Sequence, residues 1–219
     1  MKYYDKNGMW VIGDVHGCYH VLIELLKKIP KNSEICFVGD LIDRGKNSKD
    51  VIELIINNNY HCVLGNHELM WLEHKGQLSG SIFEYNGGNT TIESYENNIE
   101  LMDKHKKWLQ TLSHFEVFKF KNHKDLIVSH SNIIPYFSGY DINDYSKFQK
   151  EEIVWNRKIM GYNRHTDENF FNIFGHTPRE KVDIEKSTAI IDTGCVFGEK
   201  LSAIHYPTME IMEVDFFKI

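Results

Sequence analysis

The feature that most constrains the fold is a unit that occurs three times in the first 75 residues. Each unit has an apolar run, then a glycine followed by Asp or Asn, then a segment with apolar residues at helical spacing. The apolar runs cover 9–12, 35–38 and 62–64. Because alternating strands and helices form parallel sheets with right-handed crossovers, the repetition predicts a parallel βαβαβ core.

The remainder of the chain is predicted to be less regular and richer in strands. The elements expected there are a loop over 77–91, helices over 90–97 and 101–112, and strands over 115–120, 125–128, 170–174, 188–192, 201–206 and 209–215. The segment 132–148 is interpreted as an excursion from the fold. Since there is no internal repeat of solenoid type and no low-complexity tract, we expect one domain over residues 1–219.

Composition excludes several classes of protein. Hydrophobic residues at 42% and aromatic residues at 13% exclude a disordered chain. A net charge of −6 and the absence of a long Lys/Arg run argue against a nucleic-acid partner, and no apolar run is long enough for a membrane span. The four cysteines have no C-x-x-C spacing, so we expect a cytoplasmic protein. A monomer is assumed.

Nine polar residues follow the predicted strands. They are Asp14, His16, Asp40, Asp43, Arg44, Asn66, His67, His130 and His176. Strand ends that meet at one sheet edge bring such residues together, and mixed Asp, His and Asn ligands suit Mn²⁺, Fe²⁺ or Zn²⁺. The set is too large for one ion. Two ions that share a carboxylate would use these ligands, and sites of this kind serve phosphoryl hydrolysis.

Three motifs carry a family resemblance. Gly13-Asp-Val-His-Gly17, Gly39-Asp-Leu-Ile-Asp-Arg-Gly45 and Gly65-Asn-His-Glu68 resemble the signatures of the phosphoprotein phosphatase (PPP) branch of calcineurin-like metallophosphoesterases. The chain looks most similar to the small bacterial and lambda-phage-type serine/threonine phosphatases. The resemblance implies an α/β fold, with two mixed β-sheets packed as a sandwich, helices outside it, and the site at the carboxyl ends of the strands.

The resemblance also implies two divalent metal ions as cofactors, with Mn²⁺ expected and Fe or Zn as alternatives. The implied ligands are Asp14 and His16 for the first ion, Asn66, His130 and His176 for the second, and Asp40 as the bridge between them. A hydroxide that bridges the two ions would attack phosphorus.

Further residues would act on the substrate. The resemblance implies that His67 protonates the leaving oxygen and that Asp43 orients His67. Arg44 and Arg157 would bind the phosphate, with Asn66 beside them. Arginine forks match two phosphate oxygens, and a histidine beside an aspartate is well suited to give a proton.

The function expected from these motifs is hydrolysis of phosphoserine and phosphothreonine in a phosphoprotein or phosphopeptide. The alternative is a dinucleoside polyphosphate hydrolase that cleaves diadenosine tetraphosphate. Relatives of that kind typically lose the second acid of the middle motif and have Asp after Asn-His, whereas Asp43 and Glu68 are both present here. Leu64 departs from the pattern of the phosphatase family, because many relatives carry a phosphate-binding arginine at this position. A non-catalytic scaffold is disfavoured because every motif ligand is intact.

Overall fold

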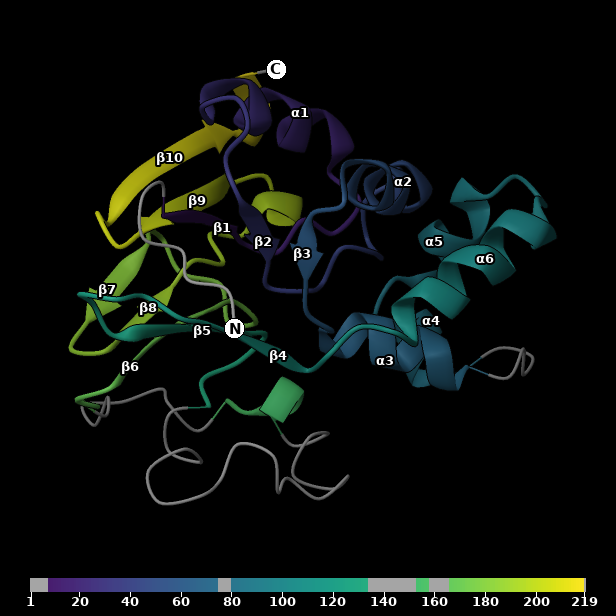
Figure 1. Cartoon of the computed structure of the whole chain (residues 1–219). Coiled ribbons are helices and arrows are strands. Elements are labelled where there is room, and N and C mark those ends of the chain that lie inside the picture. Colours follow the sequence, from purple (N-terminus) through teal and green to yellow (C-terminus); the bar gives the residue numbers. More distant parts are fainter. Residues whose placement is uncertain (1–7, 75–79, 134–152, 158–165, 219) are drawn as a thin grey trace.

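The computed structural model describes residues 8–74, 80–133, 153–157 and 166–218, and within them two five-stranded sheets (Figure 1). The first sheet has the order β10-β9-β1-β2-β3, and the second has the order β4-β5-β6-β8-β7. The strands are β1 Met9–Ile12, β2 Ile35–Phe37, β3 His61–Cys62, β4 Phe115–Phe118, β5 Asp125–Ser129, β6 Phe170–Phe174, β7 Asp183–Glu185, β8 Thr188–Ile190, β9 Lys200–Tyr206 and β10 Glu210–Asp215.

Helices cover one face of the first sheet and lie beside its β3 edge (Figure 1). They are α1 Tyr19–Lys28, α2 Ser48–Asn58, α3 Asn66–Glu73, α4 Ile82–Tyr85, α5 Gly88–Ser94 and α6 Ile99–Leu109, with short 3₁₀ helices η1 Cys195–Phe197 and η2 Phe216–Lys218. In Figure 1, α1 and α2 lie on the face of the first sheet that points away from the second sheet. No helix in the described ranges combines the length and the apolar character that crossing a membrane requires.

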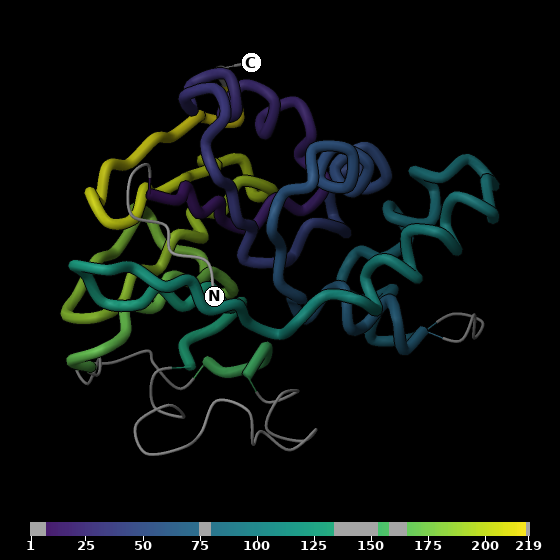
Figure 2. Tube along the Cα trace, viewed as in Figure 1, coloured from purple at the N-terminus to yellow at the C-terminus, as the bar shows by residue number. Residues whose placement is uncertain are grey.

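Both sheets are mixed, as expected. Strands β1, β2 and β3 are parallel, and β9 joins them antiparallel to β1. Figure 2 shows this return of the chain, with the purple trace of β1 beside the yellow trace of β9. In the second sheet β5, β6 and β8 are parallel, with antiparallel strands at both edges. The expected fold class, two mixed sheets flanked by helices, is therefore confirmed.

Alternation along β1 explains why its whole run is apolar. Met9 and Val11 belong to the core between the two sheets, whereas Trp10 and Ile12 belong to the core under the helices. Since successive side chains of a strand point to opposite faces, a strand between two layers must be apolar at every position. Complete burial of one such side chain contributes about 1.5–3 kcal/mol of stabilisation, so β1 stabilises both layers and fixes the loop that follows it.

The local predictions are confirmed in the first part of the chain and partly wrong in the middle. The helical segment expected after the apolar run 35–38 is α2. The loop expected over 77–91 is wrong where it is described, because it contains α4 and the start of α5. Ser81 caps α4 by accepting the backbone N–H of Glu84, a local signal that the Gly, Ser and Asn content obscured. Strand β7 was not predicted, and most of 132–148 lies outside the described residues.

Candidate metal centre

The turns after the strands hold several polar residues in left-handed backbone conformations. His16, Asp40, Asp43, Arg44 and His176 have φ values of 44°, 49°, 72°, 68° and 70°. For a residue other than glycine this conformation costs about 1–2 kcal/mol, and such strain persists only where the surrounding structure enforces it. All five are residues that the sequence assigned to a site. The strained backbone therefore directs these side chains toward the site and lowers the local stability.

The motif glycines let these turns touch one another. A Cβ on Gly39, whose φ is 89°, would overlap the backbone nitrogen of Gly65, and a Cβ on Gly45 would overlap the carbonyl oxygen of His16. The turn that contains Asp40 is thus pressed against the turns on both sides of it. Only glycine permits this approach, and the result is that Asp40 lies between the other two motifs.

Each carboxylate oxygen of Asp40 lies near a different group of atoms that could bind a metal ion. Its Oδ2 lies 3.5 Å from His16 Nε2 and 3.8 Å from His67 Nε2. Its Oδ1 lies 3.3 Å from His130 Nε2. The two groups are His16, Asp40 and His67, and Asp40, His130 and His176, all buried, with ligand atoms within 4.8 Å of one another. One carboxylate is therefore shared between two sites that can each hold a cation.

Backbone carbonyls fix the orientation of two ring ligands. His16 Nδ1 lies 2.8 Å from the carbonyl oxygen of Ile42, and His130 Nδ1 lies 2.9 Å from that of Val38. A carbonyl oxygen only accepts, so each Nδ1 carries a proton and donates it. Each Nε2 is thereby turned toward Asp40, which is the arrangement that presents a histidine to a metal ion.

The electrostatics of the cluster favour an added cation. Burial lowers the pKa of His16 and of His176 to about 3, so both rings are neutral. Burial also acts to lower the pKa of His130, but the adjacent Asp40 carboxylate outweighs it and raises this pKa to about 10. Burial acts to raise the pKa of Asp40, yet the charge of His130 holds it well below its ordinary value. The raised pKa of His130 indicates that this buried site favours a positive charge.

The donor atoms fit divalent ions of intermediate hardness. The two groups offer imidazole nitrogens and a carboxylate, and the Asn66 Oδ1 amide oxygen lies 2.9 Å from His130 Nε2. Mixed nitrogen and oxygen donors without thiolates suit Mn²⁺, Fe²⁺ or Zn²⁺ better than Ca²⁺ or Mg²⁺. The residues present therefore fit the pair of ions that the motifs imply.

Asp14 is placed differently from the other expected ligands. Its carboxylate accepts the backbone N–H of His176 at 3.1 Å, so it joins the loop after β1 to the loop after β6. It belongs to neither group of mutually close ligand atoms among the described residues, and His67 stands with His16 and Asp40 instead. The role of Asp14 as a ligand stays a prediction.

His67, a member of the first group, forms a buried pair with Asp43. His67 Nδ1 lies 2.6 Å from Asp43 Oδ2. The hydroxyl of Thr91 donates to Asp43 Oδ1 at 2.5 Å and accepts the backbone N–H of Asp43 at 2.9 Å, and Ser48 Oγ accepts the same N–H at 3.1 Å. Asp43 is held from α5 and α2, so the direction of the His67 ring is set by two helices. Thr91 was missed, because no motif connects it to Asp43.

Glu68 is a second residue whose role was missed. Its buried carboxylate accepts the backbone N–H groups of Asp40, Leu41 and Gly65 at 2.9, 2.8 and 2.8 Å. Burial raises its pKa to about 7. Glu68 joins the turn of the middle motif to the start of α3 and so positions Asp40. Its place in the third motif was the available signal.

Two arginines border the ligand groups. Arg44 Nη1 donates to His16 Nε2 at 2.7 Å, and Arg157 Nε donates to His176 Nε2 at 3.2 Å. A neutral imidazole has one nitrogen with a free lone pair, so a cation bound by His16 Nε2 would replace the hydrogen bond from Arg44. Leu64 is buried in the core under the helices and adds no charge here.

Asp192 is a further buried acid at the same edge. It follows β8, its Oδ1 accepts the backbone N–H of Gly194 at 3.0 Å, and burial raises its pKa to about 6. Its charge contributes to raising the pKa of Asp14 well above the ordinary value, after burial as the main cause. The sequence signal was an Asp directly after an apolar run, which is similar to the three motifs, where a glycine and then Asp or Asn follow the run.

Comparison with known proteins is consistent with this geometry. The model of the calcineurin-like phosphoesterase family matches residues 9–207. The bis(5'-nucleosyl)-tetraphosphatase PrpE (asymmetrical) of Anoxybacillus flavithermus is 27% identical over 93% of this chain and 92% of its own length. Serine/threonine-protein phosphatase 1 of Salmonella typhimurium is 28% identical over 89% of both chains.

A solved structure shares the fold. A crystal structure described as a candidate diadenosine tetraphosphatase has a TM-score of 0.67 and 20% identity, and covers 95% of this chain and 94% of its own. At this identity the likeness supports the fold alone.

Proposed function

Because this chain belongs to the calcineurin-like phosphoesterase family, we propose that it hydrolyses dinucleoside tetraphosphates asymmetrically, with two divalent metal ions as cofactors. Hydrolysis with two metal ions is supported by the position of Asp40, whose two carboxylate oxygens lie near two separate groups of ligand atoms. The substrate class rests on PrpE relatives that align over nine-tenths of both chains. These relatives favour the alternative over the protein phosphatase that the motifs favoured.

The residues that would hold the ions are His16, Asp40 and Asp14 on one side, and Asp40, Asn66, His130 and His176 on the other. When bound, the two ions would make a water molecule nucleophilic near neutral pH and neutralise charge that develops on the phosphate. A metal ion and a proton would compete for His130 Nε2, because only the deprotonated nitrogen can act as a ligand.

His67 would act as the proton donor. Its Nδ1 is held by Asp43, and its Nε2 points toward the ligand group of Asp40. In hydrolysis of a phosphoanhydride, the oxygen of water bonds to phosphorus, the bond to the bridging oxygen breaks, and that oxygen keeps the electron pair. His67 would give it a proton, and Asp43 would stabilise the ring while it is charged.

Arg44 and Arg157 would bind phosphate oxygens. Each guanidinium already lies against a histidine of one ligand group, so a phosphate at the centre would be within reach of both. Guanidinium groups offer paired donors to two oxygens and stabilise charge in the transition state.

Serine/threonine phosphatase activity is the second candidate, and the Asp43–His67 pair favours it. An alkoxide leaving group needs a proton far more than the phosphate leaving group of an anhydride does. The buried His67–Asp43 pair, with Nδ1 and Oδ2 2.6 Å apart, is therefore more useful for hydrolysis of a phosphomonoester than of an anhydride. The relative from Salmonella typhimurium is consistent with this candidate.

The deciding experiment compares the two substrates under one condition. Turnover of diadenosine tetraphosphate and of a phosphoserine/phosphothreonine peptide is measured in Mn²⁺, with and without a chelator. We expect chelator-sensitive turnover dominated by the dinucleotide, with a nucleoside monophosphate and a nucleoside triphosphate as products. Faster turnover of the peptide would indicate a protein phosphatase that uses the same metal centre. No turnover of either substrate would indicate a non-catalytic scaffold.

A further inference from the structure

A cavity of about 480 Å³ lies beside the candidate metal centre. Its walls come from the start of α1, the loop between Arg44 and α2, and the 3₁₀ helices η1 and η2. The lining residues that matter here are Tyr19, Val21, Arg44, Lys46, Val196 and Phe216. The volume falls within the range of roughly 300–1,000 Å³ that is typical of small-ligand sites.

We propose that this cavity binds one nucleoside of a dinucleoside tetraphosphate, namely the nucleoside next to the phosphate held at the metal centre. The inference rests on the proposed function and adds the place and the residues of a nucleoside subsite. Its support is the position of the cavity relative to Arg44 and the kind of side chains that line it.

Arg44 connects the cavity to the metal centre. Its Nη1 donates to His16 Nε2 at 2.7 Å, while its Cζ lies 5.4 Å from the centroid of the Phe197 ring. The same side chain lines the cavity. A phosphate bound by Arg44 would therefore have the centre on one side and the cavity on the other, which is where the nucleoside attached to that phosphate must go.

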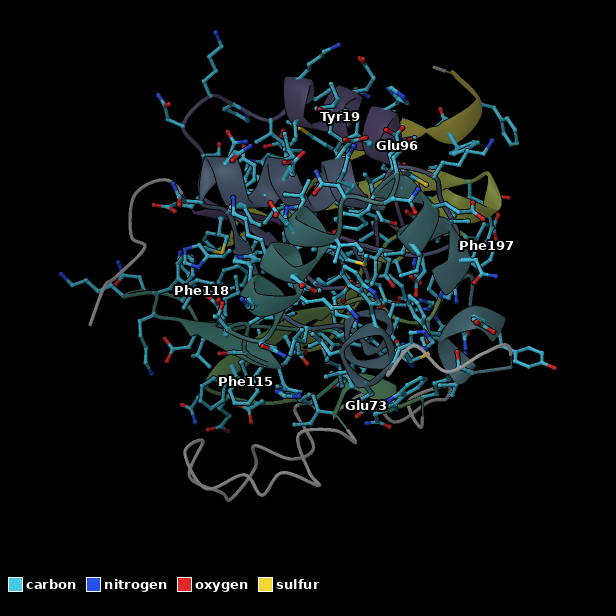
Figure 3. The ribbon with its side chains drawn as sticks, turned by 90° about the vertical axis from the view of Figure 1, so that its right-hand side faces the viewer. Tyr19, Glu73, Glu96, Phe115, Phe118 and Phe197 are labelled. Carbon is cyan, nitrogen blue, oxygen red and sulfur yellow. The ribbon has the colours of Figure 1, made fainter. Side chains whose placement is uncertain are left out.

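The lining suits a nucleobase with a phosphate attached. Val21 and Val196 supply apolar surface, and Tyr19 and Phe216 supply aromatic rings. Phe216 is 37% exposed, so its ring keeps surface on which a planar base can stack. Lys46 is exposed at the same cavity and adds positive charge for the polyphosphate. Figure 3 labels Tyr19 and Phe197 among the side chains.

The test separates nucleoside binding from chemistry at the centre. Phe216→Ala removes a stacking surface, and Val196→Trp fills the cavity. The matched control is Phe217→Ala, because Phe217 is the adjacent ring, is 81% exposed and does not line the cavity. For each variant, KM and kcat are measured with diadenosine tetraphosphate and with p-nitrophenyl phosphate, which has no nucleoside. Thermal melting checks that each variant folds.

Phe216→Ala is expected to raise KM for diadenosine tetraphosphate about tenfold, the loss typical of removing one ring from a stacked base. Val196→Trp is expected to raise this KM at least as much, because the indole would occupy the volume that the nucleoside needs. The rates of both cavity variants with p-nitrophenyl phosphate should match the wild type, and Phe217→Ala should match it with both substrates. Adenosine should inhibit the wild type competitively and lose that effect in Val196→Trp. If the wild type hydrolyses the dinucleotide and both cavity variants have the same KM as the wild type, the subsite is wrong while the proposed function stands. Absence of wild-type turnover of the dinucleotide would overturn the proposed function and the subsite together.

Discussion

His67 Nδ1 lies 2.6 Å from Asp43 Oδ2, and both side chains are buried. The two residues come from different motifs, one at the start of α3 and the other in the turn before α2. The pair is fixed by Thr91 and Ser48 on its far side and faces Asp40 on its near side. The proposed proton donor His67 is thus held next to the candidate metal centre without being free to rotate.

Replacing His67 by Asn tests its role as proton donor. We expect His67→Asn to slow hydrolysis of phosphoserine peptide or phenyl phosphate by about 100-fold or more, the scale of general acid catalysis. The loss with p-nitrophenyl phosphate should be much smaller, since its leaving group needs little protonation. The ratio of kcat values for the two esters is the measurement. Equal losses on both would remove His67 from this role.

Replacing Thr91 by Val tests whether the support of Asp43 matters for the chemistry. Thr91→Val keeps the shape of the side chain and removes the hydroxyl that contacts both the carboxylate and the backbone of Asp43. We expect kcat to fall roughly tenfold, as for other residues that orient a functional group, and Thr91→Ser to restore it. Thr90→Val is the matched control, because the Thr90 hydroxyl donates to the carbonyl oxygen of Gly87 instead. Equal kcat values for the wild type and Thr91→Val would make Thr91 merely structural.

Asp40→Asn is expected to lower metal content and activity together, because Asp40 is the residue shared by both ligand groups. Metal bound after dialysis is measured by mass spectrometry, alongside turnover. Asp50→Asn is the control, since Asp50 lies in the first turn of α2 and contacts Asn47 rather than the centre. Full occupancy by two ions and normal rates in Asp40→Asn would contradict the shared-carboxylate assignment.

The parts of the site that were predictable from sequence follow from one physical rule. A strand buried on both faces must be apolar throughout, so a polar residue directly after it marks the strand end, and parallel strand ends meet at one edge. That rule placed Asp40, His67 and His130 near one another, and the structure brings them together. The glycines beside them belong to the same motifs, and the structure gives the reason, because the turns touch where a Cβ would overlap.

Thr91 and Phe216 have no local signal in the sequence, and neither does the contact that Asp14 makes. Thr91 contacts Asp43 across 48 positions of sequence, and only tertiary packing of α5 against α2 brings them together. Phe216 lies far along the chain from Tyr19, and an aromatic residue near a chain end predicts no cavity. Asp14 followed the strand-end rule, yet its carboxylate accepts the backbone N–H of His176, a contact between two sheets that periodicity within one strand does not report.

His105 is expected to make the stability of the metal-free protein depend on pH. Its ring is 1% exposed, Nδ1 lies 2.7 Å from the hydroxyl oxygen of Tyr95, and burial lowers its pKa from 6.5 to about 4. Because the folded state binds this proton less tightly than the unfolded state, the stability is fully present above pH 6.5 and is lost as the pH falls from 6.5 through 4. The loss from this residue is of the order of 1–3 kcal/mol. Urea unfolding between pH 4 and pH 7.5 with chelator present measures it, and His105→Gln should flatten the profile relative to the wild type. His123→Gln, at an exposed position, should leave the profile unchanged, and a wild-type slope in His105→Gln would show that other groups cause the acid sensitivity.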